Sequence, residues 1–209
     1  MTIQAKSESE QSKHLQEVVA LLGEKDSSDL GRAMDLAAKS LPQPLGLAVI
    51  RSLAFHPNSC VREDAAEWLA EFGVEEDEYR IALLSHDADW SVRCTAASCL
   101  AEFKTPSSRA RLRQMAARDR VYVVRKWAVT ALFDVGDDGT LVSFLHGVLQ
   151  TEKNPFVRLV ALTSLARSGE RARKEEMLKL RENAFLKNQR LRSLFEENLT
   201  SCISDLEQV

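Results

Sequence analysis

The amino-acid sequence predicts an all-α fold, a right-handed α-solenoid of about six antiparallel helix pairs. A short frame recurs along the chain: a Val-Arg pair, an Ala three residues after the Arg, and a Leu four residues after that Ala. Its clear copies begin at Val61, Val92, Val124 and Val157, which lie 31, 32 and 33 residues apart. A regular period of this length is typical of solenoids, in which each repeat buries its apolar face against its neighbours.

The N-terminal part of the chain is expected to hold a flexible segment followed by a degenerate repeat. Residues 1–12 are polar and have no helical apolar stripe. Apolar residues at helical spacing begin after His14, and Gly23 can end that helix. A second apolar stripe runs from Leu30 toward a pair of prolines. We therefore expect an N-terminal cap repeat at residues 13–44.

Four regular repeats are expected within residues 45–169. The predicted helices are 45–55 with 60–72, 78–85 with 90–103, 108–117 with 121–135, and 140–150 with 154–168. Gly73, Gly136 and Gly169 each follow the Arg of the frame by eleven residues, where a left-handed C-cap is expected. Lys104 stands at that place in one repeat, which predicts a different helix end.

The C-terminal residues follow the frame only loosely, as terminal repeats of a solenoid do. We expect helices at 171–185 and 188–206, which form a C-terminal cap repeat within residues 170–209. Residues 13–209 are then expected to form one continuous array.

The frame has a physical explanation in the second helix of each repeat. Counted from the Val, positions 0, 4, 7, 8 and 11 fall on one face of a helix and form the core stripe. The Arg lies on the flank of that stripe, where its guanidinium can reach a carboxylate or carbonyl of the adjoining turn. Asn58, Asp89 and Asn154 precede their Val by three residues, so we predict that they cap their helices and bind the arginines. These arginines are Arg62, Arg93, Arg125 and Arg158.

This pattern resembles the short HEAT repeats of many bacterial proteins, over about residues 45–169. The residues that carry the resemblance are Asp89, Val92, Arg93, Ala96, Ala97 and Leu100, together with the other copies of the frame. The resemblance implies a curved stack of helix pairs whose second helices line a concave binding surface. It says little about function, because one fold serves many functions.

We expect no enzyme, cofactor or metal. One HEAT-like enzyme family, deoxyhypusine hydroxylase, holds iron through His-Glu dipeptides, whereas none of the histidines here is followed by Glu. The cysteines have no metal-binding spacing, which indicates packed thiols in a reducing compartment. Nothing in the chain favours a second HEAT-like family, the phycobilin lyases. Phosphate-binding loops and nucleophile elbows are not seen in the sequence.

A nucleic-acid-binding protein or DNA-glycosylase-like enzyme is the alternative function. Such glycosylases combine a basic concave face with aromatic residues and a carboxylate, for which the candidates are Trp90, Trp127, Tyr122 and Asp89. The local basic block comprises Arg109, Arg111, Arg113, Arg118, Arg120, Arg125 and Lys126. Most of this block falls on a first helix, which should be convex. The net charge of −3 also argues against a polyanion as the main partner.

The remaining surface favours a protein partner. Phe133 and Leu159 fall on a nominally exposed row beside Trp127, a combination typical of interaction sites unless curvature buries the two side chains between repeats. The acidic run from Glu63 to Glu78 is either a solvated face or a docking surface for a basic protein. The predicted protein-binding residues are Glu63, Glu67, Trp90, Lys126, Trp127, Thr130, Phe133, Leu159 and Thr163.

These observations predict a non-enzymatic HEAT-repeat interaction module, an adaptor or inhibitor that binds a partner on its concave face. One concrete version is a bacterial immunity protein whose negative face covers a toxin. Because the chain has neither a secretory signal nor a long apolar run, we expect a cytoplasmic protein without a membrane partner. We expect it to be a monomer.

Overall fold

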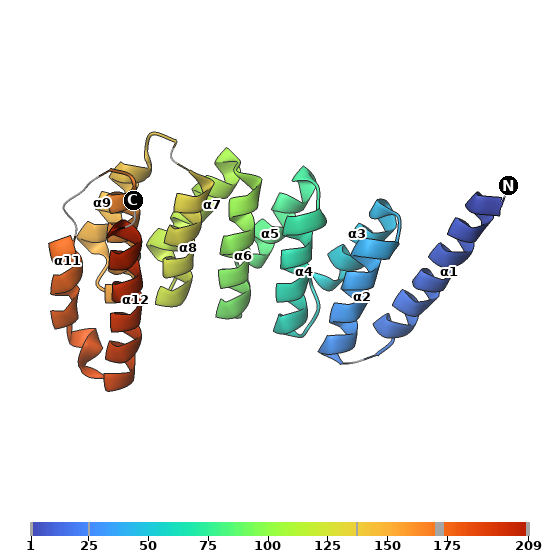
Figure 1. The fold of residues 1–209 in the computed structure, drawn as a ribbon, viewed down its shortest axis with the longest axis horizontal. Coiled ribbons are helices and arrows are strands. Elements are labelled where there is room, and N and C mark those ends of the chain that lie inside the picture. The colour runs from blue at the N-terminus through green and yellow to red at the C-terminus, as the bar shows by residue number, and fades with distance from the viewer. Residues whose placement is uncertain (1, 25, 137, 170–173, 208–209) are drawn as a thin grey trace. The chain divides into compact units, whose positions relative to one another are not determined.

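The computed structural model describes residues 2–24, 26–136, 138–169 and 174–207. Within these ranges the chain forms α-helices and short 3-10 helices and contains no β-strand (Figure 1). The predicted all-α class and the predicted helix pairs are confirmed. The chain divides into two compact units, residues 1–103 and 104–209, and each is described by itself.

Unit 1, residues 1–103, holds the first three helix pairs. They are α1 (Thr2–Leu22) with α2 (Ser27–Ser40), α3 (Gln43–Leu53) with α4 (Ser59–Phe72), and α5 (Glu78–Leu84) with α6 (Trp90–Phe103), with a 3-10 turn η1 (Glu75–Asp77) before α5. The second helices pack in sequence order, α2 against α4 and α4 against α6. In Figure 1, α4 and α6 accordingly lie side by side.

Unit 2, residues 104–209, holds the other three pairs. They are α7 (Pro106–Arg118) with α8 (Tyr122–Val135), α9 (Leu141–Thr151) with α10 (Pro155–Arg167), and α11 (Lys174–Lys179) with α12 (Gln189–Glu207), and the 3-10 turns η2 (Leu180–Glu182) and η3 (Ala184–Lys187) join the last two helices. Here α10 packs against both α8 and α12.

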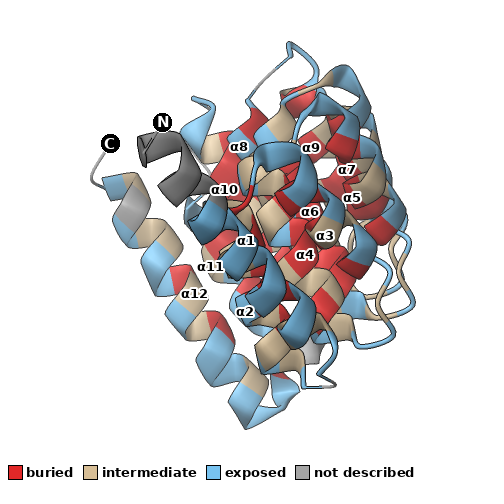
Figure 2. Ribbon diagram, turned by 90° about the vertical axis from the view of Figure 1, so that its right-hand side faces the viewer, coloured by how far each residue is buried: buried red, intermediate tan, exposed pale blue. Residues whose placement is uncertain are grey.

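Two predicted helices have different bounds in the structure. Helix α1 begins at Thr2 instead of near His14, and most of its described length is exposed (Figure 2). The single helix predicted at 171–185 is wrong, because α11 ends at Lys179 and two 3-10 turns follow, while residues 171–173 lie outside the described residues. Asn183 interrupts the helix with an extended backbone, and its side-chain amide donates a 3.2 Å hydrogen bond to the carbonyl of Lys153.

The core consists of the stripe that the frame predicts. In α4 the side chains of Val61, Ala65 and Leu69 are fully buried, and Val92 and Leu100 repeat the pattern in α6. Buried residues occupy one side of these helices and exposed residues the other (Figure 2). Burial of each Val or Leu contributes about 1.5–3 kcal/mol, so the regular stripe stabilises every repeat in the same way.

The helix ends confirm two of the C-cap predictions and correct two others. Gly136 and Gly169 adopt the expected positive φ, at 91° and 100°. Lys104 also adopts a positive φ of 53°, so its helix does not end in a different way. Gly73 is the exception, since its φ is −69°. Glycine is nevertheless required there, because a Cβ would lie 2.2 Å from the carbonyl oxygen of Leu69.

The N-caps appear where the sequence places them, but they do not bind the arginines. The side-chain oxygens of Asn58, Asp89 and Asn154 each accept a 3.0 Å hydrogen bond from a backbone N–H two residues later. Each arginine of the frame instead donates to the backbone carbonyls of a neighbouring turn. Arg62 and Arg125 also bind a carboxylate of the following repeat.

The bond between Arg62 and Asp87 shows how one repeat is tied to the next. Nε and Nη2 of Arg62 donate to the two carboxylate oxygens of Asp87 at 2.7 and 2.8 Å, and Nη1 donates to the carbonyls of His56 and Pro57. Asp87 also accepts a 2.8 Å bond from the N–H of Asp89. The two side chains are only 14% and 11% exposed. Arg125 and Glu152 repeat the arrangement in unit 2, at 2.6 and 3.0 Å.

Replacing Arg62 should destabilise the protein strongly. Arg62→Met keeps an apolar stem but leaves the carboxylate of Asp87 unpaired, and breaking a buried pair in this way lowers the free energy of unfolding by about 3 kcal/mol. Urea denaturation followed by circular dichroism measures the loss. The control is Arg32→Met, since Arg32 forms an exposed pair with Asp29 and should change stability by about 0.5 kcal/mol or less. Equal effects of the two substitutions would contradict a structural role for Arg62.

The same pair should make stability sensitive to acid. Burial raises the pKa of Asp87, but hydrogen bonds from Arg62 and from the N–H of Asp89 outweigh it and hold the pKa below its ordinary value of 3.8. A carboxyl whose pKa is lowered by folding stabilises the native state above the unfolded pKa, and that contribution is lost as the pH falls through the folded value. The stability difference between the parent and Arg62→Met should therefore be full at pH 6 and should shrink below about pH 4. A difference that stays constant with pH would show that the ion pair is not its source.

Candidate functional site

Four of the carboxylates on the second helices of unit 1 come from the adjacent helices α4 and α6. Glu63, Asp64 and Glu67 come from α4, and Glu102 comes from α6, which packs beside it. We call these four residues the acidic surface. Asp64 and Glu102 thus join the predicted residues Glu63 and Glu67.

Glu63 is held in place by α6. Its Oε1 accepts a 2.6 Å hydrogen bond from Oγ of Ser91, and its Oε2 lies 3.5 Å from Oγ1 of Thr95. Both donors are neutral hydroxyls, so they orient the carboxylate without compensating its charge. Trp90, also a predicted binding residue, precedes Ser91 and is 49% exposed. An exposed indole therefore stands at the start of the helix that holds Glu63.

Asp64 and Glu67 have no cation partner among the described residues, and their surroundings oppose ionisation. Loss of water and then the charge of Glu63 raise the pKa of Asp64 above its ordinary 3.8. Loss of water, followed by the charges of Asp64 and Glu63, likewise raises the pKa of Glu67 above 4.5. The ionised carboxylates therefore destabilise the native state near neutral pH, since each favours the unfolded chain as the pH rises through its pKa.

The buried thiol of Cys99 is also affected by charges of the acidic surface. Burial, and then the charges of Glu67 and Glu102, raise the pKa of Cys99 to about 12. The thiol therefore stays protonated, and it is not an activated nucleophile. Glu67 and Glu102 both contribute to this shift, although they belong to different helices.

The predicted residues on α8 form a separate surface in unit 2. Trp127 is 42% exposed, with the ammonium of Lys126 at 5.9 Å from its ring centre. Thr130 donates to the carbonyl of Lys126 at 3.2 Å. Phe133 is half-buried, and the guanidinium of Arg167 lies 5.8 Å from its ring centre. Trp127 is thus the accessible aromatic side chain of this surface, and Phe133 is partly covered.

Leu159 and Thr163 were placed on the exposed row by the sequence, and for these two residues that placement is wrong. Leu159 is 1% exposed and belongs to a core cluster with Phe156 and Phe195. Thr163 is 8% exposed and donates to the carbonyl of Leu159 at 2.9 Å. The reason is that α12 packs against α10 and supplies the apolar cover for this side of the helix. The alternative that neighbouring repeats bury this row is correct for Leu159.

The basic block is largely occupied by intramolecular bonds. Arg109 donates to the carbonyls of Lys104 and Val135. Arg113 binds Asp138 at 2.8 Å, and Arg125 binds Glu152. Guanidiniums that stabilise turns are not available to a phosphate backbone, so these bonds weigh against a continuous nucleic-acid surface.

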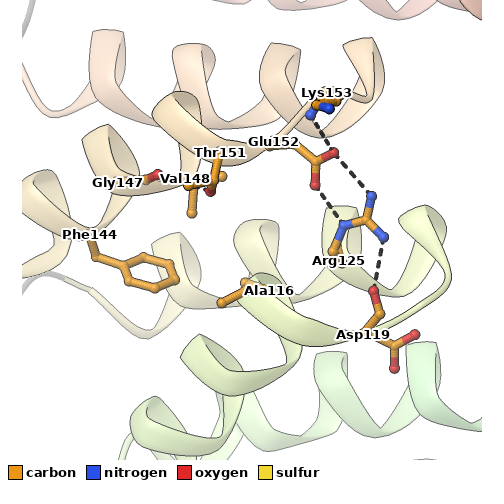
Figure 3. Close-up of a pocket in the computed structure, with 10 residues that line it drawn as sticks. Ala116, Asp119, Arg125, Phe144, Gly147, Val148, Thr151, Glu152 and Lys153 are labelled. Carbon is orange, nitrogen blue, oxygen red and sulfur yellow. Dashed lines mark hydrogen bonds and ion pairs between the residues drawn. The ribbon is translucent and has the colours of Figure 1, made fainter.

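A pocket in unit 2 lies between α7 and α9 (Figure 3). Little in the sequence predicts it. Its volume is about 520 Å³. It is lined by Ala116, Ala117, Asp119, Arg125, Phe144, Gly147, Val148, Thr151, Glu152 and Lys153. One signal is Gly147, which interrupts the apolar run of its helix. A glycine there weakens helicity and marks a close approach or an opening.

A family comparison identifies the repeats. The family model for HEAT repeats matches residues 47–132 and 77–166, more than half of the chain. The protein belongs to the HEAT-repeat family. HEAT repeats generally mediate protein–protein interaction, and their all-helical fold is typically a non-catalytic scaffold. A search of curated proteins found no match to this HEAT-repeat protein.

A membrane span and a metal site each require a particular set of residues in the described part of the chain. In it, no helix combines the length and apolarity needed to cross a membrane. The same residues bring together no group of three or more His, Cys, Asp or Glu side chains suited to a metal ion.

Replacement by Ala should affect stability more at the buried Leu159 than at the exposed Trp127. Leu159→Ala should lower the free energy of unfolding by about 3 kcal/mol, because it removes a core side chain and leaves a cavity. Trp127→Ala should cost about 1 kcal/mol or less, because much of the indole already contacts water. Denaturation curves of the two variants test this difference. A larger loss for Trp127→Ala would mean that the indole belongs to the core and is no candidate for binding.

Proposed function

We propose that this HEAT-repeat protein is a non-enzymatic adaptor or inhibitor that docks a basic protein partner on the acidic surface of α4 and α6. The observation that carries the proposal is the group of like charges, in which Asp64 and Glu67 repel one another and Glu63 without a compensating cation among the described residues. Some surface charges elsewhere in unit 1 do have a partner of opposite sign, such as Arg32 with Asp29 and Lys39 with Asp35.

A basic partner would relieve this repulsion. A Lys or Arg side chain placed between Asp64 and Glu67 favours their ionised forms and lowers the pKa of both. Binding then recovers free energy that the unbound protein loses to repulsion. It also releases protons, so the affinity should increase as the pH rises through the pKa of the carboxyls.

Aromatic residues supply the apolar part of the contact. In unit 1, Trp90 is exposed and precedes Ser91, the residue that binds Glu63. In unit 2, Lys126, Trp127, Thr130 and Phe133 are a separate candidate set of binding residues. Tryptophan is enriched among the residues that dominate binding energies, because it combines a large apolar area with a hydrogen-bond donor.

The inhibitor version resembles an immunity protein, in which the acidic surface covers the basic surface of a nuclease toxin. The proposal places the protein in the cytoplasm as a monomer. In support, all four cysteines are free, and Cys94 and Cys99 are buried as thiols. Thiols of this kind persist in reducing compartments.

Neutralising the acidic surface should remove partner binding without harming the fold. The test variant is Asp64→Asn/Glu67→Gln/Glu102→Gln, and a matched control neutralises the exposed residues Glu17, Glu24 and Glu75. The partner is captured from the native host with the tagged parent, identified by mass spectrometry and purified. Its association rate should fall about tenfold for the test variant at low salt and much less for the control, because steering depends on the local charge.

Stability provides the internal control for this experiment. The test variant should be at least as stable as the parent at pH 7, since it removes repulsion. A partner that binds the parent and the test variant equally would overturn the proposal. Salt-sensitive binding of DNA, abolished by Arg109→Ala/Arg113→Ala, would favour the alternative function in nucleic-acid binding.

A further inference from the structure

The charges of the protein are divided unevenly between the two units. Unit 1 has 9 Lys and Arg residues against 18 Asp and Glu, a net charge of −9, whereas unit 2 has 19 against 13, a net charge of +6. The net charge of −3 for the whole chain therefore results from an acidic unit followed by a basic one. A charge difference of this size between two halves of a chain indicates that the basic half interacts with a polyanion.

Five exposed cations of unit 2 lie in or beside the turns that lead into its second helices. The turn between α7 and α8 carries Arg118 and Arg120, the turn between α9 and α10 carries Lys153, and the start of α12 carries Lys187 and Arg190. The charged groups of all five have no ion-pair partner among the described residues. We call these five residues the basic edge.

Hydrogen bonds connect the three turns of the basic edge. The N–H of Lys153 donates to the carboxylate of Glu152 at 2.9 Å, and Glu152 also binds Arg125. Arg125 in turn donates to the carbonyl of Asp119 at 2.9 Å, in the turn between α7 and α8 (Figure 3). The segment that leads into α12 joins them through Asn183, whose amide donates to the carbonyl of Lys153. The five cations are therefore held on neighbouring turns of unit 2.

The carboxylates of the same turns do not cancel this positive charge. Glu152 is engaged by the guanidinium of Arg125, so this pair is neutral. Asp119 accepts a 2.9 Å hydrogen bond from the N–H of Val121 at the start of α8. Glu182 is exposed in η2. Asp119 and Glu182 are outnumbered by the five cations, and the helix dipoles of α8, α10 and α12 add positive potential at the same ends.

We propose that the basic edge binds the phosphate backbone of a single-stranded nucleic acid, one base of which stacks on Trp127. Three of the five cations are arginines, whose planar guanidinium matches the oxygens of a phosphate. The cations follow successive repeats and so form a row, which suits a polymer whose charges are regularly spaced. The acidic unit 1 repels such a strand, so we expect binding to be confined to unit 2.

The exposed indole of Trp127 favours a nucleic acid over other polyanions. Trp127 is 42% exposed and lies on α8, five residues after the helix begins at Tyr122. At about 1.5 Å per residue, the indole is about 8 Å from the basic edge. Every base has a face that can stack on an indole, whereas an acidic peptide gains little from it. The bases of a duplex are paired and stacked already, so a single strand fits better.

This site uses other residues than the basic block as a whole. Arg109, Arg113 and Arg125 are engaged in intramolecular bonds and take no part in it. Of that block, only Arg118 and Arg120 belong to the basic edge. The inference goes beyond the proposed function, because it gives unit 2 a ligand of its own with a charge opposite to that of the partner on the acidic surface.

The probe for the test is a fluorescein-labelled oligonucleotide of about twelve thymidines, a length within the usual site sizes for single strands. Fluorescence anisotropy with the full chain should give a Kd of about 10 µM or tighter at about 50 mM salt. The logarithm of the association constant should fall with the logarithm of the salt concentration with a slope of about −3.5, because each of five cations releases about 0.7 of a counterion.

Neutralising the basic edge should weaken this binding. Arg118→Gln/Arg120→Gln/Lys153→Gln should raise the Kd at least tenfold at low salt and make the salt slope shallower by about 2, because three of the phosphate contacts are lost. Melting curves should match those of the parent, since the three charged groups are exposed and have no partners.

A matched control and a second variant separate the basic edge from the net charge. The control Lys13→Gln/Arg32→Gln/Lys39→Gln removes three exposed cations of unit 1, and its Kd should stay within about twofold of the parent's. Trp127→Ala should raise the Kd about tenfold with an unchanged salt slope, because a stacking contact and no phosphate contact is lost. Trp127→Phe should restore most of the affinity.

Three results would overturn the inference. The first is an absence of oligonucleotide binding at about 100 µM protein and low salt, the weak end of the range for non-specific contacts. The second is an equal loss of affinity in the control and in the basic-edge variant. The third is a peptide of about twelve glutamates that binds as tightly as the oligonucleotide and is insensitive to Trp127→Ala, which would assign the basic edge to an acidic protein. The basic-edge and Trp127 variants leave α4 and α6 unaltered, so these results do not decide the proposed function of the acidic surface.

Discussion

Two junctions between repeats share one interaction, a largely buried guanidinium that binds a carboxylate in the turn of the following repeat. Arg62 reaches Asp87 and Arg125 reaches Glu152, and in both pairs the carboxylate also accepts a backbone N–H at the start of the next helix. Apolar packing between helices is non-directional and would tolerate small slips. A bidentate bond fixes distance and orientation, so it sets the register between neighbouring helix pairs.

The periodic parts of this architecture could be read from the sequence, because they depend on local spacing. The core stripe of Val61, Ala65 and Leu69 and the caps at Asn58 and Asp89 follow from helix geometry alone. The partner of Arg62 could not be read in this way, since Asp87 lies 25 residues further along the chain. The sequence argument gave Arg62 a carbonyl of the adjoining turn or its own N-cap. The carbonyls of His56 and Pro57 confirm the first, whereas packing between repeats decided the carboxylate partner.

The candidate site was predictable to a smaller extent, for a similar reason. Whether a side chain on a second helix is exposed depends on what covers it. Trp127 is accessible, but α12 covers α10, so Leu159 became part of the core. The pocket at Gly147 was harder still to foresee, because a cavity arises from two helices that the sequence treats separately. The positions of the charged residues, by contrast, were predictable from the sequence, since Glu63 and Glu67 lie in the predicted row.

Whether a charged group has a compensating partner therefore distinguishes the residues that stabilise the fold from the candidates for binding. Arg62, Arg125 and Asp77 are buried or partly buried and fully engaged, so their removal acts on folding. Asp64 and Glu67 gain nothing from their surroundings and raise the free energy of the native state. A folded protein retains such local conflicts where another molecule resolves them.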